Sequence, residues 1–319
     1  MLFSCPCLET LFRMRYGARA AAVLSLLLLP VALVEVAYGG PGDQIDFRTE
    51  SSLVLVPVTV TDRGGAYIGE LPRESFTVLD NRQPQPITVF NNVDAPCAMG
   101  IILDISGSVR GRLDRQKLAA RAAAEMLEPA DEYFLMSVSS SPGRLSGMGG
   151  DPASIANLLQ GLTAGGWTAL YDTIAKGLAE VRNSQRPRHA LLVISDGLDN
   201  HSRITRIELT RALEEADVRV YSLAIEDTQV NRKAMALEEA QRGRVALDEL
   251  ARKSGGLSLR VGPGEDPAPA ARRIASAIHN QYVLGYRTPR SGSGKWHTIQ
   301  VKIDRQHSNV YARTGYREP

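Results

Sequence analysis

Cysteine is scarce in this chain of 319 residues, and its distribution excludes disulfides as a framework for the fold. Only three cysteines are present, and Cys5 and Cys7 lie at the extreme N-terminus. Cys97 is the sole cysteine of the remaining chain and has no disulfide partner there. We interpret it as a small apolar residue at the start of a strand rather than as a reactive thiol.

Strong charge of one sign and paired histidines are also missing. The formal net charge is +2 and no block of Lys and Arg occurs, which gives no basis for nucleic-acid binding. None of the five histidines forms a His-x-x-x-His pair, which argues against zinc. The stretch 291–295 is similar to a phosphate loop, but Pro289 stands where that loop needs Gly and Trp296 where it needs Ser or Thr. We expect no small-molecule cofactor.

One apolar run near the N-terminus indicates targeting. Three arginines between residues 13 and 19 precede the run Ala20–Val34, and Ala37-Tyr38-Gly39 follows. This order is typical of a secretory signal. The run contains Pro30 and is shorter than the ~20 residues that span a bilayer. We expect residues 1–39 to be a signal peptide cleaved near Gly39 and the protein to be secreted or periplasmic; an uncleaved membrane anchor is the alternative.

The stretch that follows Ala98 is the most informative part of the chain. An apolar run, Ala98–Leu103, ends in Asp104, and Ser106 and Ser108 follow at alternate positions. A run that is apolar on both faces predicts a buried parallel strand, and ligands bind at the carboxyl ends of such strands. Three hard oxygen donors without His or Cys indicate Mg²⁺, Ca²⁺ or Mn²⁺.

Two later stretches supply further oxygen donors. Gly165-Gly166-Trp167-Thr168 is a loop that delivers a hydroxyl just before a helix predicted over 169–181. A second apolar run, His189–Ile194, predicts a buried strand, and Ser195-Asp196-Gly197 follows it. If the two strands are neighbours, Asp104 and Asp196 lie at adjacent carboxyl ends of one sheet.

This order of residues resembles the metal-ion-dependent adhesion site of von Willebrand factor type A domains. The resemblance covers roughly residues 96–280 and implies a doubly wound, mostly parallel, Rossmann-like sheet. It also implies a coordination position left open for a carboxylate from a protein partner. The implied metal ligands are Asp104, Ser106, Ser108, Thr168 and Asp196. Capping of the next helix is the alternative role for the first three, but it does not explain Thr168 and Asp196.

A rim around this site is predicted to contact the partner. Trp167 lies on a glycine-flanked loop, which favours exposure, and Trp is enriched at binding hot spots. His201 follows Asp196 closely and can lie near the same loop. The predicted rim consists of Trp167, Gly166, Gly197 and His201.

Both ends of the mature chain are predicted to be β-structure. Runs rich in β-branched residues, with turn residues between them, occur over 52–61, 76–80 and 87–90, and further strands are predicted over 281–286, 296–303 and 309–313. We predict that an α/β domain over 96–280 is inserted into a small β-sandwich built from residues 46–95 and 281–316.

Between the flanks, strands alternate with helical patterns, which favours a doubly wound sheet. One such helix is predicted over 113–127, with Leu118, Ala122 and Met126 on its buried face. The flanking segments 56–62, 76–81 and 311–316 also resemble a family of secreted type A-related proteins found widely in acidobacteria. That second resemblance concerns architecture more than function.

The sequence therefore predicts a non-enzymatic, extracytoplasmic, metal-dependent protein-binding module with no catalytic residues. A divalent cation, Mg²⁺ or else Ca²⁺ or Mn²⁺, would be completed by an Asp or Glu of a protein partner. One alternative is a scaffold or assembly factor whose metal site is structural. A hydrolase that uses Ser106 with His189 or His201 as base is a weaker alternative, because the Gly-x-Ser-x-Gly motif is missing.

Overall fold

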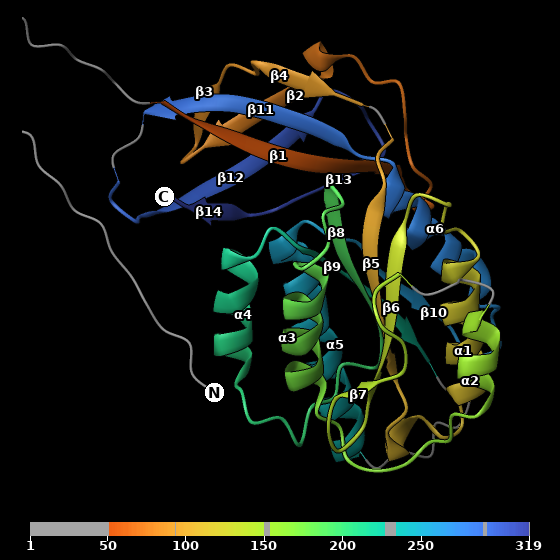
Figure 1. The fold of residues 1–319 in the computed structure, drawn as a ribbon. Coiled ribbons are helices and arrows are strands. Elements are labelled where there is room, and N and C mark those ends of the chain that lie inside the picture. Colours follow the sequence, from red (N-terminus) through yellow and green to blue (C-terminus); the bar gives the residue numbers. More distant parts are fainter. Residues whose placement is uncertain (1–50, 93, 150–153, 227–233, 290–291, 319) are drawn as a thin grey trace, which may run out of the picture. The chain divides into compact units, whose positions relative to one another are not determined.

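The computed structural model describes residues 51–92, 94–149, 154–226, 234–289 and 292–318 (Figure 1). The predicted signal peptide lies outside these residues. Within the described ranges, no helix is both long enough and apolar enough to cross a bilayer.

A six-stranded sheet forms the centre of the α/β region. Its strand order is β10-β9-β8-β5-β6-β7, and only β7 is antiparallel to its neighbour. The strands are β5 (Cys97–Asp104), β6 (Glu132–Val138), β7 (Gly143–Arg144), β8 (Arg188–Ile194), β9 (Arg219–Ile225) and β10 (Ser258–Val261). Every residue of β5 is buried, as its continuous apolar run predicted, because helices cover both faces of the sheet.

Helices lie on both faces of this sheet (Figure 1). One face packs against α1 (Leu113–Ala124), α2 (Ile155–Gln160) and α6 (Ala268–His279). The other packs against α3 (Leu170–Val181), α4 (Arg206–Glu215) and α5 (Ala234–Ser254). The short 3₁₀ helices η1 (Arg73–Ser75) and η2 (Gly107–Val109) complete the helical elements of the described chain.

The buried face of α1 differs in part from the predicted one, since Ala122 is buried but the other two predicted residues are not. Leu118 is 44% exposed and Met126, which lies beyond the end of the helix, is 37% exposed. The buried face is instead made mainly of alanines, including Ala119, Ala120 and Ala123, which pack in the same core cluster as α6. Small side chains allow two helices to approach closely, so the larger residue, Leu118, is left on the solvent side.

The order of the strands creates a switch point at the centre of the sheet. The chain passes from β5 to β6 on one side and then returns to β8 on the other side of β5. Such a reversal leaves a crevice beyond the carboxyl ends of the two strands between which it occurs. Leu103 of β5 is paired with Ile194 of β8, so the residues that follow them emerge side by side.

Two antiparallel sheets form the β-sandwich, with strand orders β13-β1-β11-β4 and β14-β12-β2-β3. The strands are β1 (Ser51–Asp62), β2 (Phe76–Asp80), β3 (Gln83–Gln85), β4 (Val89–Asn91), β11 (Tyr282–Pro289), β12 (Trp296–Ile303), β13 (Ser308–Ala312) and β14 (Gly315–Arg317). Each sheet combines strands from both ends of the described chain, and one apolar core joins the sheets. The predicted fold class is confirmed.

Gly100 in the middle of β5 tests how tightly the central strand is packed. A methyl group at this position would lie 2.5 Å from Leu191 Cδ2 and closer still to the ring of Phe134. We therefore expect Gly100→Ala to lower the free energy of unfolding by about 1–3 kcal/mol through overpacking. Urea denaturation measures the change.

Gly161 supplies the matched control for that substitution. It has a helical conformation at the end of α2, and a methyl group there would meet no atom within 4 Å. Gly161→Ala should change stability by no more than about 0.5 kcal/mol. Equal effects of the two substitutions would contradict the packing that we describe around β5.

Candidate metal centre

Asp104 ends β5 and is fully buried at the switch point. Its Oδ1 accepts a hydrogen bond from the Ser106 amide at 2.9 Å, and its Oδ2 accepts one from Ser195 Oγ at 2.7 Å. Burial raises the pKa of Asp104, and the negative charge of nearby Asp196 raises it further. The structure therefore places two carboxylates close enough to repel each other in a water-poor site.

The two serines of the motif lie against each other in the loop that leaves β5. Ser106 is fully buried and Ser108 is exposed, and their Oγ atoms are 3.0 Å apart. The loop continues as η2 and then enters α1. One hydroxyl is thus buried and the other lies at the surface. This arrangement would allow a ligand to be bound by the buried hydroxyl and to be reached from solvent.

Thr168 lies in a loop that is joined to both of the others. The Gly107 amide donates to Gly166 O at 3.0 Å, and the Gly165 amide donates to Ile105 O at 2.8 Å. On its other side, the Thr168 amide donates to Asn200 Oδ1 at 2.9 Å. Thr168 itself is only 2% exposed. The predicted meeting of three loops at one edge of the sheet is therefore present in the structure.

Arg112 is the main residue of this site that the sequence analysis missed. Its guanidinium is 3% exposed and forms an ion pair with Asp196 Oδ2. Arg112 also occupies the N-cap position of α1, where its side chain makes no capping hydrogen bond and the helix dipole disfavours a cation. One signal in the sequence could have indicated this pair. A basic residue stands at the start of a helix, eight positions after a buried carboxylate.

Buried polar groups without partners lie in the same part of α1. Among the described residues, Arg112 Nε and both amide atoms of Gln116 have no hydrogen-bond partner, and Gln116 is fully buried one helical turn after Arg112. Such groups destabilise a fold by about 1–3 kcal/mol each unless solvent or a ligand satisfies them. The interior near the site is thus polar and incompletely satisfied by protein atoms alone.

The donor set fits a hard divalent cation. It offers carboxylates from Asp104 and Asp196 and hydroxyls from Ser106, Ser108 and Thr168, which are the oxygen ligands that Mg²⁺ and Ca²⁺ prefer. Two neighbouring buried carboxylates also need positive charge nearby, of which Arg112 supplies one unit. The loops that carry these residues lie at one edge of the sheet.

The predicted rim is exposed for three of its four residues. Trp167 is 61% exposed and stacks on His201, with ring centroids 6.1 Å apart and planes 17° apart; Gly166 and His201 are exposed as well. Gly197 differs, because it is buried and a methyl group there would overlap the carbonyl of Gly243 in α5. Gly197 has φ +81°, so it shapes the loop and offers no contact surface.

The position of His189 argues against its role as general base in the serine-hydrolase alternative. His189 lies near the start of β8, at the opposite end of the strand from Ser195, and its Nε2 is 3.3 Å from Ser184 O. The oxygen found near Ser106 Oγ is that of Ser108. His201 stacks on Trp167. None of these contacts pairs the serine with a histidine.

Solved structures with a similar fold include three bacterial proteins. An aerotolerance-related membrane protein from Bacteroides fragilis is 17% identical, with 57% of this chain and 98% of that chain covered and a TM-score of 0.46. The PilB minor pilin from Streptococcus sanguinis is 13% identical, with 62% and 63% covered and a TM-score of 0.45. The vWF domain of the type V pili tip protein Mfa5 from Porphyromonas gingivalis is 13% identical, with 58% and 96% covered and a TM-score of 0.45.

A family model gives the more specific match. No curated protein matches the chain in sequence. The model described as von Willebrand factor type A domain matches residues 99–198, a segment that begins in β5 and ends just after Asp196 and Gly197. The chain therefore contains a von Willebrand factor type A domain.

Proposed function

We propose that this protein is an extracytoplasmic, metal-dependent protein-binding module. A divalent cation, Mg²⁺ before Ca²⁺ or Mn²⁺, would be held by Asp104, Ser106, Ser108, Thr168 and Asp196. The ion supplies a positively charged point that accepts a carboxylate from a protein partner. The type A domain supports a role in protein interaction.

The observation that carries the proposal is the pair of buried carboxylates at the switch point. Asp104 ends β5 and Asp196 lies two residues beyond the end of the neighbouring strand β8, and each is nearly or fully buried. Two carboxylates would balance one divalent cation, but Arg112 already offsets the charge of Asp196, and the three hydroxyls are neutral, so a bound ion would keep a net positive charge. An Asp or Glu of the partner would then complete the coordination and form a strong, charge-assisted contact.

The exposed residues of the rim would provide a binding surface around the contact between the metal and the partner carboxylate. Trp167 and His201 stack on each other in solvent, and Trp is the residue type that most often anchors an interface. Beside the loop that follows Asp196, a groove of about 900 Å³ is lined by residues of α3, α4 and α5, among them Tyr171, Arg206 and Arg242. We propose that the partner contacts Trp167 and His201 and enters toward Asp196.

Arg112 has a defined place in this proposal. It neutralises Asp196 when no metal is bound, so that the fold does not depend on the ion. A bound metal and the Arg112 guanidinium would then compete for the negative charge of the same carboxylates. Arg112 would therefore lower the affinity of the site for the metal. The leader sequence supports the extracytoplasmic location, where free divalent cations are abundant.

Asp104→Asn tests the metal site because it keeps the shape of the side chain and removes its charge. Wild-type protein should be stabilised by Mg²⁺, by about 2.7 kcal/mol at 100 times the dissociation constant, and the variant should gain almost nothing. Without metal, the variant should be at least as stable as wild type, because one of two repelling carboxylates is gone. Thermal denaturation with Mg²⁺ and with EDTA measures both effects.

Asp304→Asn is the control, since Asp304 is exposed in the sandwich. It should respond to Mg²⁺ as wild type does. If wild-type stability is the same in Mg²⁺ and EDTA, the metal part of the proposal fails. If Mg²⁺ stabilises the protein but partner capture from an envelope extract is unaffected by EDTA and by Asp104→Asn, the site is structural and the scaffold alternative replaces the proposal.

Arg112→Met tests the balance between guanidinium and metal. Breaking a buried ion pair from one side should destabilise the metal-free protein by about 3–5 kcal/mol, because Asp196 is left unpaired beside Asp104. Saturating Mg²⁺ should restore a large part of this loss, so the Mg²⁺-dependent rise in Tm should be larger than in wild type. A rise equal to that of wild type would show that Arg112 and the metal act independently.

Trp167→Ala separates partner binding from metal binding. Trp167 is exposed and its side chain contributes no oxygen ligand, so the affinity for Mg²⁺ in calorimetry should stay within about twofold of wild type. Retention of the partner on immobilised protein should fall by tenfold or more, as expected for loss of a hot-spot residue worth about 2 kcal/mol. Unchanged retention would place the binding surface elsewhere.

A further inference from the structure

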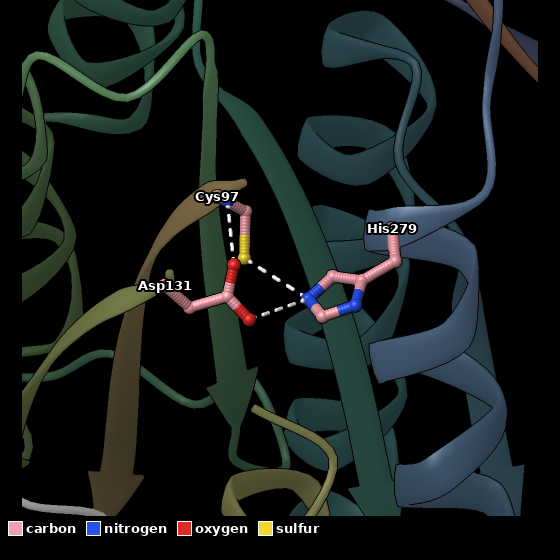
Figure 2. A group of neighbouring side chains, drawn as sticks. All are labelled: Cys97, Asp131 and His279. Atoms are coloured by element: carbon pink, nitrogen blue, oxygen red, sulfur yellow. Dashed lines mark hydrogen bonds and ion pairs between the residues drawn. The ribbon is translucent and has the colours of Figure 1, made fainter. Parts of the chain in front are cut away.

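Cys97, Asp131 and His279 converge at the opposite end of β5 from the candidate metal centre (Figure 2). Cys97 is the first residue of β5, Asp131 directly precedes β6, and His279 is the last residue of α6. Seven residues separate Cys97 from Asp104, which corresponds to about 23 Å along a strand. The two clusters are therefore separate sites on one strand.

The three side chains offer one ligand atom each. His279 Nε2 is 3.3 Å from Cys97 Sγ and 3.1 Å from Asp131 Oδ2. Zinc forms bonds of about 2.3 Å to sulfur and about 2.0–2.1 Å to nitrogen and oxygen, so tetrahedral ligands have S···N near about 3.6 Å and N···O near about 3.3 Å. The separations in the structure match this geometry to within a few tenths of an ångström.

Burial and second contacts hold the three groups in place. The side chains of Cys97, Asp131 and His279 are 0%, 2% and 9% exposed. Asp131 is fixed by amide donors, from Cys97 to Oδ1 at 2.8 Å and from Glu128 to Oδ2 at 2.7 Å. His279 Nδ1 faces Glu128 Oε1 at 4.0 Å, and a carboxylate on that side is the usual partner of a metal-bound histidine.

The surrounding charge also favours a cation. Asp94 and Glu128 form a second carboxylate group around His279, and both are exposed. Arg188 is the nearby opposing charge, and its Nη1 is 3.3 Å from Asp94 Oδ1. Three carboxylates against one guanidinium leave the cluster with net negative charge, and a divalent cation would offset it.

A catalytic cysteine does not fit the same geometry. Burial raises the pKa of the Cys97 thiol, and the charge of Asp131 raises it further, whereas a nucleophilic cysteine needs a lowered pKa. In a Cys-His-Asp triad a carboxylate is hydrogen-bonded to the ring nitrogen that does not face the thiol. Here Glu128 Oε1 is 4.0 Å from His279 Nδ1, too far for a hydrogen bond, and Asp131 meets the same nitrogen, Nε2, as the thiol.

We propose that Cys97, Asp131 and His279 bind Zn²⁺, with water in the fourth position. The borderline-soft zinc ion suits one thiolate, one imidazole and one carboxylate, whereas Mg²⁺ prefers oxygen alone. Cys97 begins β5 and His279 ends α6, so they lie where the chain enters the α/β region from β4 and leaves it toward β11. The ion would join these two connections and stabilise the folded protein.

Cobalt is the spectroscopic probe for the thiolate. Co²⁺ added to the full chain, purified after chelation and without a polyhistidine tag, should produce the thiolate charge-transfer band and intense tetrahedral d–d bands. The band should persist in the double variant Cys5→Ser, Cys7→Ser and be lost in Cys97→Ala. No band in wild type, or a band that survives Cys97→Ala, overturns the proposal.

His279→Gln and Asp131→Asn test the other two ligands while the Cys97 thiol is kept. Each should weaken Zn²⁺ binding by at least about 100-fold, the upper cost of losing even an indirect partner of a zinc site. Zn²⁺ should raise the Tm of wild type and of Asp104→Asn alike, and leave His279→Gln unchanged. If wild type is not stabilised by Zn²⁺, or if His279→Gln is stabilised equally, the cluster is a hydrogen-bonded structural group and the proposal is wrong.

Discussion

The electrostatics of the switch point are determined by two buried carboxylates that repel each other. Asp104 and Asp196 emerge from adjacent strands, and burial together with their mutual repulsion raises the pKa of Asp104. Hydrogen bonds hold both carboxylates in place: Asp104 accepts from the Ser106 amide of its own loop and from Ser195 of the neighbouring loop, and Asp196 accepts from the Leu198 amide. Arg112 places a positive charge beside them through its ion pair with Asp196.

Much of this site follows from sequence alone, for a clear physical reason. Strands that are apolar on both faces must be buried, and buried parallel strands bring their carboxyl ends to one edge. Asp104 and Asp196 could therefore be placed near each other from the runs Ala98–Leu103 and His189–Ile194. The exposure of Trp167 followed in the same way from the glycines that precede it in its loop.

What the sequence did not reveal depends on contacts between distant elements. The burial of Gly197 depends on α5, where Gly243 approaches it closely. The buried face of α1 depends on α6, which selects alanines over Leu118. The contact of Cys97 with His279 joins residues 182 positions apart, so no local spacing can predict it. Cys97 was interpreted as a small apolar residue because its two polar neighbours come from other parts of the chain.

The insertion of the α/β region into the sandwich has a mechanical consequence. The strands that precede and follow it belong to the same sheet, since β11 pairs with both β1 and β4. A force applied at the carboxyl end of β5 is therefore shared by two covalent connections that enter one sheet. Moving the α/β region away from the sandwich would strain both connections at once.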